Sequence, residues 1–152
     1  MMWLPAVLVV IYEVSEPDFA WNNHGLLEIV DIFVRYAFTI VFTFVMTIMM
    51  KATLRRVRPV FENWDWLQNL RGFEKNFALP SGDTAQASTF AFFIMFNYGN
   101  PFFLYIIPTV AYGRIYYQCH WIGDTIAGAF LGLLGAFISH MIVPNLSKLF
   151  SP

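Results

Sequence analysis

Charged residues are scarce in this chain. They make up only 12% of its 152 residues, whereas a soluble domain carries about 25%. The net charge is -1 and no sustained basic stretch occurs outside one loop, so we expect no binding to nucleic acid. Cys119 is the only cysteine, which excludes a disulfide within the chain. This surface does not suit a water-soluble domain, a nucleic-acid-binding protein or a disulfide-stapled scaffold.

Hydrophobic residues, in contrast, make up 58% of the chain and include 17 phenylalanines. They occur in long runs and not in alternation, which predicts helices, because a helix satisfies its own backbone hydrogen bonds inside a bilayer. The first long run is sufficient to cross about 30 Å of hydrocarbon. The four expected spans are residues 26–50, 84–98, 102–117 and 122–143, and residues 1–11 form a further short hydrophobic helix.

We therefore expect an all-α fold, a multi-span transmembrane helical bundle of about four spans plus the short N-terminal helix. Its length predicts a single integral membrane domain over residues 1–152, surrounded by membrane lipids. Asp31 and Arg35 are four residues apart in the first span and are expected to pair, which neutralises the cost of burying them. Gly128 and Gly132 form a small-xxx-small pattern that predicts close helix packing.

The first polar cluster follows the first span and reads Lys51-Ala-Thr-Leu-Arg-Arg-Val-Arg58-Pro59. A basic segment at this place could simply anchor the chain to anionic lipid headgroups. Alternatively, Lys51 and Arg58 converge on a phosphate. Arginine offers a fork that matches two phosphate oxygens, and lysine supplies a mobile point charge.

The second polar cluster is Pro80-Ser81-Gly82-Asp83, at the start of the second long span. Proline before a helix, with serine and aspartate in its first turn, is ordinary capping chemistry. The same arrangement can bind an anion, because a helix begins with unpaired amides. In that reading the Ser81 hydroxyl and the Gly82 amide hold the anion.

The third polar cluster runs from Gly113-Arg114 to His120-Trp-Ile-Gly-Asp124. A histidine beside a tryptophan at the membrane interface could serve only as an anchor. However, His120 and Asp124 are four residues apart, which places them on one face if the turn is helical. A carboxylate on one ring nitrogen would fix the tautomer and leave the other nitrogen available for nucleophilic attack.

The expected topology brings the three clusters together. Because the first span delivers Lys51 to one membrane face, the span that begins near Thr84 must leave from that face. The turn at Asn100 then lies on the opposite face, and the next span brings Arg114 back. The last span departs from His120, so all three clusters reach the same face.

In their order and spacing, the three clusters resemble the type 2 phosphatidic acid phosphatase family, whose superfamily includes vanadium-dependent haloperoxidases. That family has the pattern Lys-x6-Arg-Pro, then Pro-Ser-Gly-His, then Ser-Arg-x5-His-x3-Asp, and the chain is similar to it from Lys51 to Asp124. The resemblance implies a helical bundle that hydrolyses a lipid phosphate or diphosphate without a metal or other cofactor.

The resemblance also implies a role for each matching residue. His120 attacks phosphorus to form a phosphohistidine, Asp124 orients His120, and water then cleaves the intermediate. The phosphate is held by five residues: Lys51, Arg58, Ser81, Gly82 and Arg114.

Two positions depart from the family pattern, since Gly113 replaces a serine and Asp83 replaces the histidine that protonates the leaving group. An aspartate is ordinarily an anion at neutral pH and so is a poor acid, unless burial keeps it protonated. A departing phosphate, whose second pKa is about 6, needs less protonation than an alkoxide. We therefore expect diphosphate lipids, such as isoprenoid diphosphates, to be better substrates than simple monoesters.

Two other classes of function remain open. A family member that has lost its acid could serve as a lipid-phosphate-binding protein or as a structural subunit among partner subunits of a membrane complex. A transporter or channel is a third class, supported only by Glu28, Asp31 and Arg35 in or near the first span.

Overall fold

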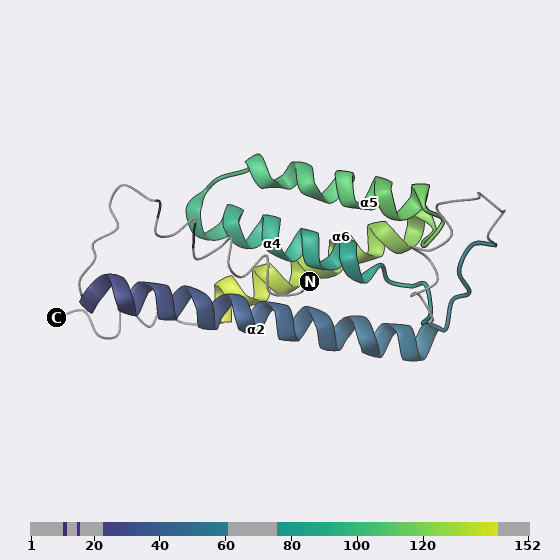
Figure 1. The fold of residues 1–152 in the computed structure, drawn as a ribbon. Coiled ribbons are helices and arrows are strands. Elements are labelled where there is room, and N and C mark those ends of the chain that lie inside the picture. Colours follow the sequence, from purple (N-terminus) through teal and green to yellow (C-terminus); the bar gives the residue numbers. More distant parts are fainter. Residues whose placement is uncertain (1–10, 12–14, 16–22, 61–75, 143–152) are drawn as a thin grey trace.

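The computed structural model describes residues 11, 15, 23–60 and 76–142, apart from a few side chains at 23–28 (Figure 1). Within these residues every regular element is a helix, which confirms the all-α fold class. Except for Ile11, the short helix expected at residues 1–11 lies outside the described residues. The elements are α2 (Asn23–Leu54), α4 (Gly82–Tyr98), the 3-10 helix η1 (Phe102–Tyr105), α5 (Ile106–Tyr116) and α6 (Ile122–Ile142).

Two of the described helices are long and apolar enough to cross a membrane, over Ile29–Leu54 of α2 and over Ile122–Ile142 of α6. Both expose large apolar side chains, such as Val41 at 60% and Phe130 at 64%. In a bilayer such side chains would face lipid at no cost. Helix α4 has 17 residues and α5 has 11, fewer than the about 20 that a crossing ordinarily requires. Their crossing of the membrane stays a prediction.

Helices α4 and α6 form the centre of the bundle, with α2 along one side and α5 along the other (Figure 1). The two central helices approach closely because α6 carries glycines on the face toward α4. A methyl group at Gly128 would collide with the carbonyl oxygen of Ser81, and one at Gly132 would collide with that of Ala85. The predicted close packing at these two glycines is confirmed.

An aromatic core lies at the end of the bundle away from the three polar clusters. Ile32 and Tyr36 of α2 pack there against Phe90, Phe93 and Ile94 of α4. The rings of Tyr36 and Phe93 meet edge to face, with centroids 5.0 Å apart, a preferred geometry for aromatic pairs.

A buried polar stripe runs along α2 with a residue at every fourth position. Asp31 and Arg35 form the predicted ion pair, with Oδ2 and Nη1 3.8 Å apart. The stripe continues through Thr39, Thr43 and Thr47, all buried. Thr39 and Thr47 donate to the carbonyl four residues earlier at 2.8 Å. The hydroxyl of Thr43 accepts a hydrogen bond from that of Thr89 in α4 at 3.1 Å. The next position along this stripe is Lys51, which brings its charge to the end of the bundle that holds the clusters.

Candidate active site

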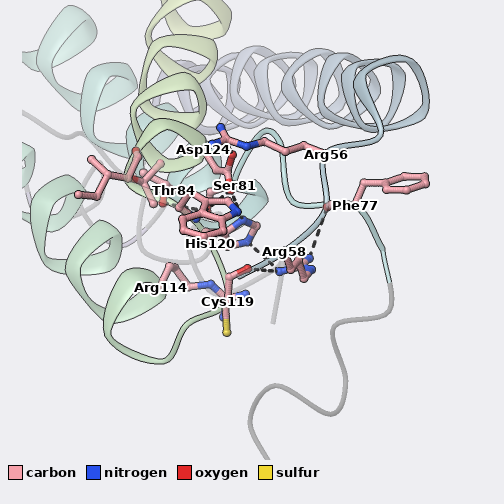
Figure 2. Close-up of polar contacts among 12 residues, drawn as sticks. Arg56, Arg58, Phe77, Ser81, Thr84, Arg114, Cys119, His120 and Asp124 are labelled. Atoms are coloured by element: carbon pink, nitrogen blue, oxygen red, sulfur yellow. Dashed lines mark hydrogen bonds and ion pairs between the residues drawn. The ribbon is translucent and has the colours of Figure 1, made fainter. Parts of the chain in front are cut away.

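The three polar clusters meet at one end of the bundle, as the topology predicted (Figure 1). The first cluster begins in the last turn of α2 with Lys51 and continues past Leu54, where Arg55 follows the helix with a positive φ of 44°. The second lies at the N-terminus of α4. The third spans the end of α5, the connecting turn and the start of α6. Figure 2 shows side chains of all three clusters pointing toward His120.

His120 lies in the turn between α5 and α6 and is only 3% exposed. The turn is tight because Gln118 adopts a positive φ of 52°. The amides of Cys119 and His120 both donate to the carbonyl of Arg114, at 3.0 and 3.2 Å. Since α6 begins only at Ile122, His120 does not share a helical turn with Asp124, and the helical spacing considered above is not what brings them together. The two side chains nevertheless face each other.

Asp124 is fully buried and has partners on both carboxylate oxygens. Oδ2 accepts a hydrogen bond from the amide of Trp121 at 2.9 Å and lies 3.8 Å from Nδ1 of His120. Oδ1 accepts from Nη1 of Arg56 at 3.0 Å. A buried carboxylate is tolerated when such partners compensate its charge. The carbonyl of Asp124 also accepts from the amide of Ser81 at 2.9 Å, which ties α6 to the start of α4.

The other ring nitrogen of His120 faces Arg58. Nη1 of Arg58 lies 3.3 Å from Nε2 of His120 (Figure 2). Because a guanidinium can only donate hydrogen bonds, Nε2 must act as the acceptor. The ring proton of the neutral histidine is then on Nδ1, toward Asp124. This tautomer leaves the lone pair of Nε2 on the side of the arginine.

Arg58 and Lys51 both contact the segment just before Pro80. Arg58 is 9% exposed and donates to the carbonyl of Asn76 at 2.8 Å, to Oδ1 of Asn76 at 2.6 Å and to the carbonyl of Cys119 at 2.6 Å. Nζ of Lys51 donates to the carbonyl of Phe77 at 2.6 Å. These contacts hold both cations against the same segment, and Arg58 in addition lies beside His120. Nothing in the spacing of the clusters indicated Asn76 or Phe77.

Ser81 and Gly82 lie where α4 begins. Ser81 is fully buried, and its hydroxyl lies 3.0 Å from that of Thr84. Ser81 occupies the N-cap position of α4 and Asp83 lies in the first turn, as the capping interpretation expects, but the Ser81 side chain makes no capping hydrogen bond. A methyl group at Gly82 would make only ordinary contact with Thr47 at 3.8 Å. Packing therefore does not require glycine at this position.

Asp83 forms an ion pair with Arg114, with Oδ2 and Nε 3.1 Å apart. The Nε–H direction does not fit a hydrogen bond, so the contact is electrostatic. The Asp83 side chain is 61% exposed and that of Arg114 is 21% exposed. Burial, which could keep an aspartate protonated, is thus not available to Asp83. The ion pair thus joins the residue at the position of the expected acid, Asp83, to a residue expected to bind phosphate, Arg114.

An open pocket of about 480 Å³ reaches His120 from one side. Apart from the histidine, its lining is mainly apolar and comprises Pro59, Val60, Ile115, Gln118, Trp121 and Ile122. Trp121 is fixed there because its indole N–H donates to the carbonyl of Val57 at 3.1 Å. In the described part of the chain, no group of three or more His, Cys, Asp or Glu residues could hold a metal ion.

No curated protein and no solved structure gives a significant match. The family model of the PAP2 superfamily matches residues 32–148, which include all three polar clusters and more than half of the chain. The resemblance first drawn from the spacing of the clusters is confirmed, and the chain belongs to the PAP2 superfamily.

Proposed function

We propose that the chain is a membrane phosphatase that hydrolyses lipid diphosphates in preference to lipid monoesters, through a phosphohistidine on His120. Membership of the PAP2 superfamily indicates phosphatase activity on phosphate esters, often those of lipids. The observation that carries the finer proposal is the position of the His120 ring, between the carboxylate of Asp124 and the guanidinium of Arg58.

The first step is attack by the lone pair of Nε2 on the terminal phosphorus. The bond from this phosphorus to the bridging oxygen breaks, and the lipid monophosphate leaves with the electron pair. The imidazole becomes a phosphorylated imidazolium whose Nδ1–H faces Asp124. The buried carboxylate stabilises this charge as it develops, as in other nucleophile–base–carboxylate sites.

In the second step, water attacks the phosphohistidine. The N–P bond breaks, inorganic phosphate is released and Nε2 regains its lone pair. Phosphate oxygens are stronger hydrogen-bond acceptors than the carbonyls that now hold Arg58 and Lys51. We infer that these two cations, with Arg114, the Ser81 hydroxyl and the Gly82 amide, bind the oxygens of the transferred group. Such donors stabilise the charge that develops in the transition state.

The preference for a diphosphate follows from the Asp83–Arg114 ion pair. An exposed carboxylate held by an arginine does not supply the proton that an alkoxide leaving group needs. A leaving phosphate is far less basic, because its second pKa is about 6. Cleavage between two phosphates therefore proceeds without a protein acid more readily than cleavage of a phosphate from an alcohol.

The lipid character of the substrate is supported by the apolar pocket beside His120. Ile115, Trp121 and Ile122 line it, and both Trp121 and Ile122 are exposed at the start of a helix apolar enough to span a membrane. An apolar chain attached to the phosphate can occupy this pocket and continue into the bilayer. We accordingly propose a multi-pass arrangement in which α4 and α5 lie at membrane depth and the site opens at the interface.

A second candidate function rests on the same ion pair. If Asp83 occupies Arg114 permanently, the site could bind a lipid phosphate without turnover, and the chain would act as a lipid-phosphate-binding or structural subunit beside partner subunits. The two functions differ in a single observable, which is the release of inorganic phosphate.

The test compares purified protein in mixed micelles on a polyprenyl diphosphate and on phosphatidic acid at neutral pH. We expect release of one phosphate per diphosphate, a slower reaction with phosphatidic acid, and loss of both in His120→Ala. Faster cleavage of phosphatidic acid would contradict the diphosphate preference. Binding of both lipids with no phosphate release would establish the second candidate instead.

A further inference from the structure

Arg56 is a charged residue of the site to which the motifs assign no role. It occupies one of the six unspecified positions between Lys51 and Arg58. Its side chain is 43% exposed, yet Nη1 contacts the fully buried carboxylate of Asp124 at 3.0 Å. Arg55, its neighbour, instead points its Nε to the carbonyl of Ala52 at 3.1 Å and stays exposed. The two adjacent arginines therefore have different environments.

The guanidinium of Arg56 is held in place from several directions. The carbonyl of Arg56 accepts a hydrogen bond from the amide of Ala78 at 2.8 Å. The guanidinium carbon lies 6.0 Å from the ring centroid of Trp121, within the range of a cation–π contact. A methyl group at Gly123 would come within 3.3 Å of Nη1. Because Gly123 has no side chain, the first turn of α6 leaves room for this guanidinium.

The contact with Arg56 bears directly on how Asp124 meets His120. One carboxylate oxygen binds Arg56, and the other binds the amide of Trp121 and faces Nδ1 of the histidine (Figure 2). With both oxygens engaged, the carboxylate cannot rotate away from the ring. The arginine also compensates part of the charge of a carboxylate that is removed from water.

We propose that Arg56 is a positioning residue that sets both the orientation of Asp124 and the pH at which His120 loses its proton. Its catalytic consequence rests on the phosphohistidine mechanism proposed above. Without Arg56, the buried carboxylate would have the protonated imidazole as its main cationic partner. The histidine would then hold its proton to higher pH and would be available for attack over a narrower range.

Among the residues that the structure describes, the other charged groups around His120 come from α2, the segment after it, α4, α5 and α6. Arg58, in the segment after α2, faces Nε2 directly, and Lys51, in the last turn of α2, donates to the carbonyl of Phe77. From α5, Arg114 is paired with Asp83 of α4. From α6, Asp124 faces Nδ1. Arg56 is the cation bound to the carboxylate of Asp124. Its removal therefore changes the charge on the side of the ring that Nδ1 faces, and not the charge beside Nε2.

The experiment is an NMR titration of the imidazole of His120 in the full chain in detergent micelles, which requires no turnover. The chain has three histidines, and His120→Ala assigns the signal. Wild type is compared with Arg56→Gln, with Arg56→Lys, which keeps the charge, and with the matched neighbour Arg55→Gln. The rate of polyprenyl diphosphate hydrolysis is measured on the same samples as a function of pH, and the acid limb of this profile is compared between variants.

In Arg56→Gln we expect the titration midpoint to rise by about one pH unit, since a charged neighbour within several ångströms shifts such midpoints by this order. The acid limb should move by the same amount, and Arg56→Lys and Arg55→Gln should stay near wild type. An unchanged midpoint in Arg56→Gln, or an equal rise in Arg55→Gln, would overturn the inference. If Arg56→Gln does not fold, Arg56→Met takes its place, because it also removes the charge and keeps an unbranched side chain. The same rise is expected there, and an unchanged midpoint would overturn the inference.

The inference and the proposed function fail in different ways. An inactive wild-type protein would refute the phosphatase, while the NMR midpoints would still show whether Arg56 acts on His120. An active protein whose midpoints and acid limb do not respond to Arg56→Gln would refute the inference alone.

Discussion

The carboxylate of Asp83 lies 3.1 Å from Nε of Arg114, so the residue in the place of the family's acid holds one of the arginines expected to bind phosphate. A histidine at this position would remove the carboxylate of residue 83 from Arg114 and would bring a proton donor to the leaving group. One substitution therefore alters both the phosphate site and the acid. The substrate preference that we propose rests on this pair.

Asp83→His should restore cleavage of monoesters. We expect phosphatidic acid hydrolysis to rise at least about tenfold, because a positioned general acid contributes that much or more, with a smaller change for a polyprenyl diphosphate. Asp83→Asn is the matched control, since it also releases Arg114 but supplies no acid. Equal gains in phosphatidic acid hydrolysis in the two variants would show that the gain comes from breaking the ion pair with Arg114 and not from a new general acid.

Filling the apolar pocket should impair lipid substrates selectively. We expect Ile122→Trp to lower kcat/KM for a polyprenyl diphosphate about tenfold, equivalent to roughly 1.4 kcal/mol of lost apolar contact. Cleavage of a soluble aryl phosphate should change little, since it has no long chain. Ile126→Trp is the control, because Ile126 lies one turn later on α6, is similarly exposed at 58% against 63%, and does not line the pocket. Equal losses on both substrates would contradict a role of this pocket in binding the chain.

The contact between α4 and α6 should not tolerate a methyl group. At Gly132 a Cβ atom would lie 2.6 Å from Cβ of Ser88 and from the amide nitrogen of Thr89. We expect Gly132→Ala to reduce the free energy of unfolding by about 1–3 kcal/mol through overpacking, seen as a lower melting temperature in detergent. Gly113→Ala should be neutral or stabilising, because nothing lies within 4 Å of its added carbon. A stable Gly132→Ala would show that the two helices are less closely packed.

Much of this fold follows from the order of the residues. Long apolar runs predict helices because no other open structure satisfies its backbone in lipid, and the helices at Gly82–Tyr98 and Ile122–Ile142 begin and end close to the expected bounds. Helix α2 continues to Leu54, beyond the expected limit at residue 50, because hydropathy marks the crossing of hydrocarbon and not the last helical hydrogen bond. The pair of Asp31 and Arg35 followed from helical spacing alone.

The candidate site was predicted as a set of residues but not as a set of contacts. Spacing identified His120 and Asp124, and the topology brought Arg58 and Arg114 to the same end. The contact of Arg58 with Asn76 and that of Arg56 with Asp124 join segments far apart in the sequence. Such contacts depend on how the chain turns between helices. No local periodicity encodes that path, so they could be found only in the folded structure.

The central claim is that phosphoryl transfer proceeds through His120, and the most direct measurement is capture of the phosphoenzyme. Wild-type protein is mixed with a polyprenyl diphosphate, quenched in base within milliseconds and digested for mass spectrometry. We predict one added phosphoryl group on the peptide that contains His120, stable in base, lost in acid, and absent in His120→Ala. Turnover without phosphorylation at His120, or turnover that survives in His120→Ala, would contradict the account.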